Sequence, residues 1–153
     1  MKAIRGVPDP APERGLPATP REGTQGASIG RERTSVLAID DEPLILKVVA
    51  QILGLEHDVT CEPSAVAALE RFRSGQRFDV VLCDLMMPRM TGIDLHSALL
   101  EIDPKQAGAM LFLTGGAFTA RTQAFVDRFQ HATIEKPFNQ ATLVRRVREL
   151  LGR

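Results

Sequence analysis

Five polar residues of this sequence stand directly after short apolar runs, where their side chains could act together. They are Asp40, Asp41, Asp84, Thr114 and Lys136. Three carboxylates that lie close together repel one another, which raises at least one pKa unless a cation lies among them. Hard oxygen ligands suit Mg²⁺, which keeps several of its waters and favours sites that it shares with a phosphate group. If the fold gathers these residues, they predict a Mg²⁺ site that also takes a phosphoryl group.

A carboxylate in such a cluster can serve as the nucleophile of phosphoryl transfer. Asp84 would attack the phosphorus in line, while the metal and Lys136 offset the charge on the phosphoryl oxygens. Thr114 would donate a hydrogen bond to one of those oxygens. A single acidic residue after a strand is equally well explained as a helix cap, so the interpretation depends on the convergence of all five residues.

The elements that must position these residues follow from the hydrophobic pattern. Short apolar runs predict five strands, at 35–39, 58–61, 78–83, 109–113 and 132–134. Segments with helical spacing alternate with them, at 43–53, 65–73 and 93–101, then after Thr119 and after Asn139. Unbroken apolar strands separated by helices indicate an α/β fold, a doubly wound parallel sheet covered on both faces. Its ligand crevice lies beyond the carboxyl ends of the strands, where the five polar residues stand.

The predicted helices carry recognisable start and stop residues. The N-cap candidates are Ser64, Thr119 and Asn139. Pro43 suits the first turn of a helix, since its missing N–H has no partner to lose there. Gly54 and Gly75 are expected to end the first two helices. Leu44 in the first helix and Val66 in the second belong to the apolar patterns, so we expect both to pack inward.

The composition is that of an ordinary globular chain. It has 153 residues, of which 44% are hydrophobic, with 19 basic and 19 acidic residues. This balance argues against a nucleic-acid binder that depends on bulk charge. No apolar stretch resembles a signal peptide, and none approaches the ~20 apolar residues that cross a membrane. The cytoplasm is therefore the expected compartment.

Residues 1–34 differ from the rest of the chain. They hold five Pro and five Gly and almost no large apolar side chains. Such a segment cannot bury enough surface to offset the entropy of ordering it. We expect a flexible Pro-, Gly- and Arg-rich tail or linker there, rather than a nucleic-acid-binding arm, and one domain over 35–153.

The cysteines and histidines do not suggest a metal or redox site. Cys61 and Cys83 lie in apolar, strand-like contexts and are expected to be reduced, buried thiols. They lack the paired spacing of a zinc site. The three histidines, His57, His96 and His131, have no metal-ligand spacing and are interpreted as surface or helix residues.

Taken together, the motifs resemble the receiver domain of two-component response regulators. The matching pieces are Asp40-Asp41-Glu42-Pro43, Asp84 with Met87-Pro88 and Thr91-Gly92, Thr114-Gly115, and Lys136-Pro137-Phe138. They keep the order and the spacing of that family over residues 35–151. The resemblance implies a flavodoxin-like, five-stranded parallel sheet of order 2-1-3-4-5.

For the site, the resemblance implies transfer of a phosphoryl group from a kinase phosphohistidine to Asp84. Asp41 and Asp84 would bind Mg²⁺ directly, with Asp40 acting through water and the Met86 carbonyl as a further ligand. Thr114 would then be the switch hydroxyl. In the same way, Lys136 would bind the phosphoryl group, and the peptide bond that follows it is expected to be cis.

Two departures from the family pattern affect the expected output. Thr133 stands where many relatives have an aromatic residue that reports phosphorylation, so half of the usual switch is missing. Met86 and Gly116 occupy the positions that guide the hydrolytic water, and neither has a polar side chain. We therefore predict slow to moderate loss of the phosphoryl group.

The partners follow from the resemblance. The chain ends soon after its last predicted helix, so we expect a single-domain receiver, similar to the C-terminal receivers of hybrid histidine kinases, in a phosphorelay or docking role. It would receive phosphate from a sensor or hybrid histidine kinase, or from a histidine phosphotransfer protein, and act on a downstream protein as a monomer or weak dimer. No nucleic-acid or membrane partner is expected. The arginines of the last helix form either a solvated face or part of a partner face.

Two alternatives remain open at the level of sequence. A Mg²⁺-dependent phosphatase with an aspartyl nucleophile would need an Asp-x-Asp pair after the first strand and a cap domain, whereas here Asp40 and Asp41 are adjacent. A receiver-like binding module that is never phosphorylated would not need the intact acidic pair, acceptor, threonine and lysine. We therefore expect a signalling switch rather than an enzyme.

Overall fold

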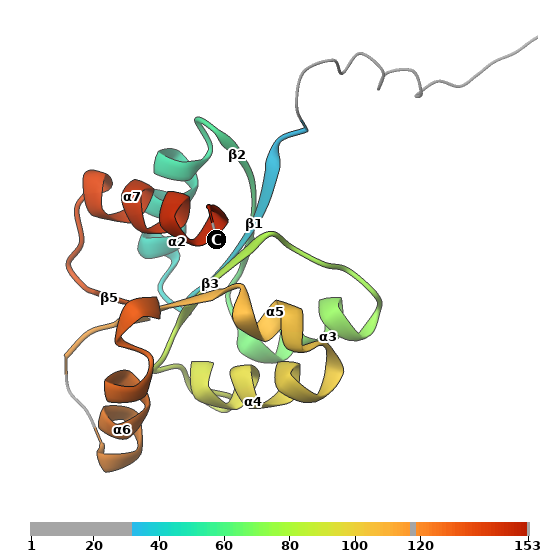
Figure 1. Ribbon diagram of the computed structural model, residues 1–153, viewed down its shortest axis with the longest axis vertical. Helices are drawn as coiled ribbons and strands as arrows, with labels where there is room; N and C mark the ends of the chain where they lie inside the picture. The colour runs from blue at the N-terminus through green and yellow to red at the C-terminus, as the bar shows by residue number, and fades with distance from the viewer. Residues whose placement is uncertain (1–31, 117–118, 153) are drawn as a thin grey trace, which may run out of the picture. The chain divides into compact units, whose positions relative to one another are not determined.

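The computed structural model describes residues 32–116 and 119–152 (Figure 1). Its strands are β1 (Thr34–Ile39), β2 (His57–Glu62), β3 (Val80–Asp84), β4 (Met110–Thr114) and β5 (Thr133–Glu135). Its helices are α2 (Pro43–Leu53), α3 (Ala65–Arg73), α4 (Gly92–Ile102), α5 (Pro104–Gly108), α6 (Ala120–Arg128) and α7 (Gln140–Leu151), with a 3₁₀ turn η1 at Gln130–Ala132. The tail predicted for residues 1–34 lies, except for its last three residues, outside the described part of the chain.

The five strands form one parallel sheet of order β2-β1-β3-β4-β5. Helices α2 and α7 lie together on one side of it, and α3, α4 and α5 lie on the other (Figure 1). The doubly wound α/β fold and the strand order predicted from the sequence are therefore confirmed. All carboxyl ends of the strands meet at one edge of the sheet.

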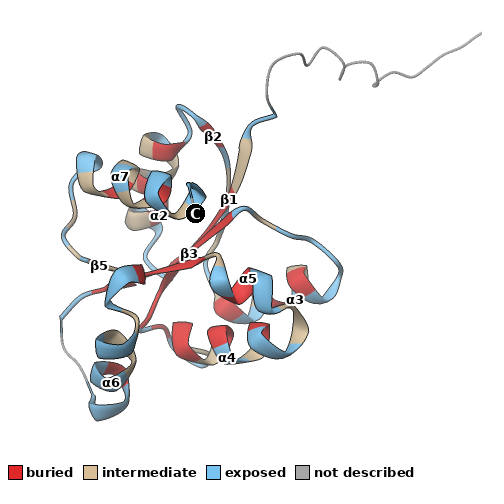
Figure 2. Ribbon diagram, viewed as in Figure 1, coloured by how far each residue is buried: buried red, intermediate tan, exposed pale blue. Residues whose placement is uncertain are grey.

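The core lies on both faces of the central strands. Every residue of β3 and of β4 is buried, as the uniform colour of the sheet centre in Figure 2 shows. This is the reason why these strands read as unbroken apolar runs rather than as an alternating pattern. Because β3 and β4 are packed on both faces, their last residues, Asp84 and Thr114, have fixed positions.

The helix caps agree with the sequence signals. Ser64 and Asn139 accept hydrogen bonds from the backbone N–H groups three residues ahead, and Thr119 does the same for Thr122. Pro43 is the first residue of α2. Gly75 follows the end of α3 with a φ of 101°, a left-handed conformation that favours glycine.

Helix α6 is joined to α4 and β4 mainly by aromatic rings. His96 of α4 is buried, with ring centroids at 5.0 Å from Phe129 and 5.5 Å from Phe125. Phe125 in turn lies 4.9 Å from Phe112 of β4. Burial lowers the pKa of His96, and the charge of Arg128 acts in the same direction, so the imidazole is held neutral.

Several predicted strand boundaries were wrong, for identifiable reasons. The strand predicted at 78–83 begins only at Val80, because the backbone N–H and carbonyl of Phe78 pair with the side chain of Gln106. Asp84 and Thr114 are the last residues of β3 and β4 rather than the first residues beyond them. Helix α5, which carries Gln106, was not predicted at all.

Some predicted burial was also wrong. Leu44 and Val66 are 70% and 44% exposed, since they lie on helix sides that face away from the sheet. Cys61 is exposed because it lies on the edge strand β2, whereas Cys83 in the central strand is buried as predicted. His57 was interpreted as a surface or helix residue, but it is a buried residue of β2.

Candidate functional site

The carboxyl edge of the sheet brings the predicted site residues together. Asp40 follows β1, Asp84 ends β3, and one carboxylate oxygen from each lies within 4.8 Å of the other and of one from Asp41. Asp40 and Asp84 are buried, with 1% and 5% of their surface exposed, whereas Asp41 is exposed. Thr114 ends β4, and Lys136 follows β5. The strand ends therefore supply the five polar residues that the sequence singled out, and Met86 lies in the loop that follows β3.

Lys136 is the cation of this cluster. Its Nζ donates a hydrogen bond to Asp40 Oδ2 at 2.9 Å and a longer one to Glu42 Oε1 at 3.3 Å. The same nitrogen lies 3.6 Å from Asp84 Oδ2. The backbone N–H of Lys136 also donates to the Thr114 carbonyl, which fixes the start of the lysine side chain against β4.

The electrostatics reflect this crowding. Burial, followed by the charge of Asp40, raises the pKa of Asp84 from 3.8 to about 6, although Lys136 and the Met86 N–H act against the shift. Burial alone would lower the pKa of Lys136, but its bond to Asp40 and the charge of Asp84 raise it above its ordinary value. Lys136 therefore keeps its positive charge. That single charge does not balance the negative charges of the carboxylates around it.

Thr114 presents an unpaired hydroxyl at the same edge. The residue is 1% exposed, and its Oγ1 has no hydrogen-bond partner among the described residues. A buried polar group without a partner is rare and calls for an explanation. The hydroxyl proton is free to bond to a group that enters the site.

The loop after Asp84 is held close to the acceptor by two features. The Met86 N–H donates to Asp84 Oδ1 at 3.3 Å. At the start of α4, a Cβ on Gly92 would come within 2.6 Å of the Asp84 carbonyl oxygen, so only glycine fits this approach. Thr91 and Asp94 then form a capping box that fixes the first turn of α4.

An open pocket of about 400 Å³ lies over the acceptor. Its lining consists of Asp41, Glu42, Asp84, Met86, Gly115, Gly116 and Lys136. Asp40 and Thr114 are buried and are not among the lining residues. Glu42 is the residue to which sequence reasoning gave no role: it is the N-cap of α2 but makes no side-chain cap bond, which leaves its carboxylate free to reach Lys136.

The donor set suits a hard divalent cation. Three carboxylates within 4.8 Å of one another offer the oxygen ligands that Mg²⁺ prefers, and the raised pKa of Asp84 shows that added positive charge would be favourable there. Asp41 and Asp84 line the pocket, whereas Asp40 is buried. These residues therefore fit a magnesium site.

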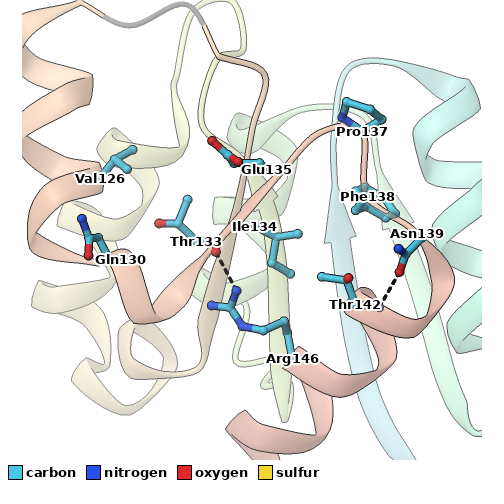
Figure 3. Close-up of a pocket in the computed structure, with 10 residues that line it drawn as sticks. All are labelled: Val126, Gln130, Thr133, Ile134, Glu135, Pro137, Phe138, Asn139, Thr142 and Arg146. Carbon is cyan, nitrogen blue, oxygen red and sulfur yellow. Dashed lines mark hydrogen bonds between the residues drawn. The ribbon is translucent and has the colours of Figure 1, made fainter.

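A second open pocket, of about 490 Å³, lies beside Thr133 between α6, β5 and α7 (Figure 3). Thr133 Oγ1 donates to the Phe129 carbonyl at 2.8 Å, and Arg146 Nη1 donates to the Thr133 carbonyl at 2.9 Å. Thr133 thus ties β5 to the end of α6 and to α7 by hydrogen bonds. The Lys136–Pro137 peptide at the far end of β5 is cis, as expected.

The described helices include none with the length and apolar character needed to cross a membrane.

Comparison with known proteins agrees with this architecture. The sequence profile of the family described as "Response regulator receiver domain" matches residues 36–148. The chain is 31% identical over 118 residues to the heme response regulator HssR of Staphylococcus aureus (strain Newman). That stretch covers 76% of this chain and 51% of HssR, so the chain spans about half the length of the curated relatives it matches.

Solved structures show the same fold. A response regulator receiver protein from Sinorhizobium medicae WSM419 is 28% identical, with a TM-score of 0.67, over 79% of this chain and 96% of that one. A CheY-like receiver domain protein from Methanospirillum hungatei JF-1 is 26% identical, with a TM-score of 0.69, over 79% and 95%. On the profile match, the sheet order and these neighbours, the chain belongs to the response regulator receiver domain family, whose members act in two-component signalling.

Proposed function

We propose that Asp84 accepts a phosphoryl group from the phosphohistidine of a histidine kinase or histidine phosphotransfer protein, with Mg²⁺, and so switches the chain's binding to other proteins. The observation that carries this proposal is the convergence at Asp84. Two further carboxylates lie within 4.8 Å, and the Lys136 ammonium lies 3.6 Å from its Oδ2.

In the proposed reaction, a carboxylate oxygen of Asp84 attacks the phosphorus. The new O–P bond forms as the N–P bond of the phosphohistidine breaks, and the imidazole nitrogen leaves with the electron pair. Lys136 would move part of its bonding from Asp40 to the phosphoryl oxygens. Mg²⁺, when bound by Asp41, Asp84, the Met86 carbonyl and, through water, Asp40, would offset the remaining negative charge.

The buried hydroxyl of Thr114 supports the switch part of the proposal. Its Oγ1 has no partner among the described residues, and a phosphoryl oxygen on Asp84 would supply one. A bond of this kind would draw the end of β4 towards the acceptor. Because β4 pairs with β5, the change would be passed to the strand that carries Thr133.

We further propose that the chain is a switch and not an enzyme acting on external substrates. It would catalyse only its own phosphoryl transfer and a slow hydrolysis. The slow hydrolysis is supported by two residues that line the pocket over Asp84, Met86 and Gly116. Neither of them has a polar side chain that could orient a water molecule. The expected partners are the phosphohistidine protein and a downstream protein target, with the chain as a monomer or weak dimer.

The test uses a small phosphodonor. The chain is incubated with acetyl phosphate and Mg²⁺, and its intact mass is measured, with Asp84→Asn as control. We expect one phosphate per chain, and none in the variant. Release of many equivalents of inorganic phosphate would instead indicate a phosphatase, and the absence of any adduct would indicate a binding module that is not phosphorylated.

The metal site has its own test. We expect Mg²⁺ to raise the melting temperature relative to the chain in EDTA, because it relieves the repulsion among the three carboxylates. Asp41→Asn should weaken this effect at least about tenfold in Mg²⁺ concentration. Asp127→Asn, an exposed carboxylate of α6, is the matched control and should respond like the wild type. Equal Mg²⁺ responses in both variants would contradict the assignment.

A further inference from the structure

Helix α6 has one buried residue, and that residue is polar. Of its nine residues, all of them described, only Thr122 is buried, with 3% of its surface exposed. Figure 2 shows the rest of α6 as mainly exposed. A threonine buried in this way normally has a hydrogen-bonded partner for its hydroxyl. The hydrogen-bond partners of Thr122 therefore indicate which part of the protein α6 contacts through this residue.

Thr122 belongs to a short chain of hydrogen bonds that ends at the acceptor loop. Its N–H donates to Thr119 Oγ1 at 3.1 Å, the two hydroxyls lie 3.0 Å apart, and Thr122 Oγ1 lies 3.7 Å from Met86 Sδ. A thioether has no proton to give, so Thr122 must be the donor to the sulfur. The single proton of Thr122 is then used, and Thr119 must be the donor between the hydroxyls.

Met86 is the side chain that this bond restrains. Its backbone N–H donates to Asp84 Oδ1, and Met86 lines the pocket over Asp84 together with Gly116, which has no side chain of its own. A methionine has three rotatable bonds, and this one is 44% exposed, so without a restraint it would sample several rotamers. The bond from Thr122 selects one of them.

We propose that Thr122 is a positioning residue for the acceptor site: by holding the Met86 sulfur, it keeps the thioether at the pocket rim and limits the access of water to phosphorylated Asp84. In the hydrolysis that it slows, a water oxygen attacks the phosphorus, the Asp84 O–P bond breaks, and the carboxylate is restored as inorganic phosphate leaves. This inference rests on the proposed phosphorylation of Asp84. It also makes the position of α6 a determinant of the lifetime of the phosphoryl group.

The test measures that lifetime directly. Wild type, Thr122→Val and Thr122→Ser are phosphorylated with acetyl phosphate and Mg²⁺, the donor is removed, and the loss of phosphate is followed by intact mass. Valine has the same shape without the hydroxyl, and serine restores the hydroxyl. The loss of one hydrogen bond corresponds to about a three- to tenfold change in rate. We expect dephosphorylation of Thr122→Val to be faster by that factor, dephosphorylation of Thr122→Ser to be near the wild-type rate, and the rate of phosphorylation to change less than about twofold.

A double-mutant cycle separates this role from a general loosening of the fold. In a Met86→Ala background, which keeps the backbone carbonyl, Thr122→Val should have no additional effect on the lifetime. Thr142→Val, on α7 away from the acceptor, is the matched control and should match the wild type. An unchanged lifetime in Thr122→Val, or an effect that persists without Met86, would overturn the inference alone. A wild-type chain that takes up no phosphate would overturn the proposed function as well.

Discussion

At the scale of single residues, the site is defined by an excess of negative charge around Asp84. Carboxylate oxygens of Asp40 and Asp41 lie within 4.8 Å of one from Asp84, and Lys136 is the one basic residue within ion-pair distance of Asp84 in the described part of the chain. Because the ammonium is shared with Asp40 and Glu42, it neutralises Asp84 only in part. The ionised carboxylate of Asp84 is therefore destabilised, by burial and by its acidic neighbours, in the absence of a cation.

This destabilisation predicts a stability effect of Asp84→Asn in metal-free buffer. The folded-state pKa of Asp84 is about 6, and its ordinary value is 3.8. Ionisation of this carboxyl therefore costs almost no stability below pH 3.8, the cost grows between about pH 4 and pH 6, and above pH 6 it levels off at about 3 kcal/mol. We expect Asp84→Asn to be more stable than the wild type by about 1–3 kcal/mol at pH 7.5 in EDTA, and equal to it near pH 3.5. Urea unfolding at both pH values checks this, and a stability difference that does not change with pH would contradict it.

Lys136 is expected to couple phosphorylation of Asp84 to the structural response, rather than to be required for binding of Mg²⁺. We expect Lys136→Ala still to bind Mg²⁺ and to take up phosphate from acetyl phosphate, about tenfold or more slowly, because one stabilising charge is lost. The response should be lost, read as unchanged amide NMR shifts of Thr133 and Ile134 on phosphorylation. Lys105→Ala, an exposed lysine of α5, is the matched control. A normal response in Lys136→Ala would count against the role of the lysine.

At the scale of elements, the start of α4 holds the acceptor strand in place. Gly92 packs directly on the backbone of Asp84 and Leu85, and the capping box of Thr91 and Asp94 fixes the turn around it. Asp94 also pairs with Arg121 of α6 at 2.8 Å. The same helix start therefore touches β3 on one side and α6 on the other, which links the acceptor to the helix that carries Thr122.

We expect Gly92→Ala to destabilise the fold by about 1–3 kcal/mol. Its Cβ would lie 2.6 Å from the Asp84 carbonyl oxygen and 3.0 Å from Leu85 Cα, and backbone atoms cannot easily move aside. Gly108→Ala is the matched control, since its Cβ would meet nothing within 4 Å. Urea unfolding of both variants measures the difference. A Gly92→Ala variant as stable as Gly108→Ala would show that a Cβ at position 92 can be accommodated beside the Asp84 backbone.

At the scale of the whole molecule, the fold could be predicted because the buried parallel sheet leaves a strong pattern. Strands β3 and β4 are apolar except for their last residues, Asp84 and Thr114. The apolar runs predict the layers of the fold, and the polar residues at their ends predict the edge of the sheet where the site lies. The N-caps Ser64, Thr119 and Asn139 could be predicted because each satisfies a local backbone donor. Local chemistry and strand ends thus carried most of the information.

The features of the fold and of the site that could not be predicted depend on contacts between segments that are distant in the sequence. The side chain of Gln106 forms hydrogen bonds with the backbone N–H and carbonyl of Phe78, so Phe78 is not part of β3. Lys136 donates a hydrogen bond to Glu42, which is 94 positions earlier in the chain. The bond from Thr122 to Met86 joins residues 36 positions apart. No periodicity or local motif indicates such pairs, because they exist only once the sheet has brought the segments together.

The identity of the phosphorylated residue tests the central proposal most directly. Borohydride reduces an acyl phosphate to an alcohol but leaves free carboxylates unchanged, so phosphorylated Asp84 would become homoserine. The chain is treated with acetyl phosphate and Mg²⁺, reduced, digested and analysed by peptide mass spectrometry. We predict homoserine at position 84 alone, dependent on both the donor and the metal. Homoserine at position 40 or 41 instead, or at no position, would contradict the assignment of Asp84 as the acceptor.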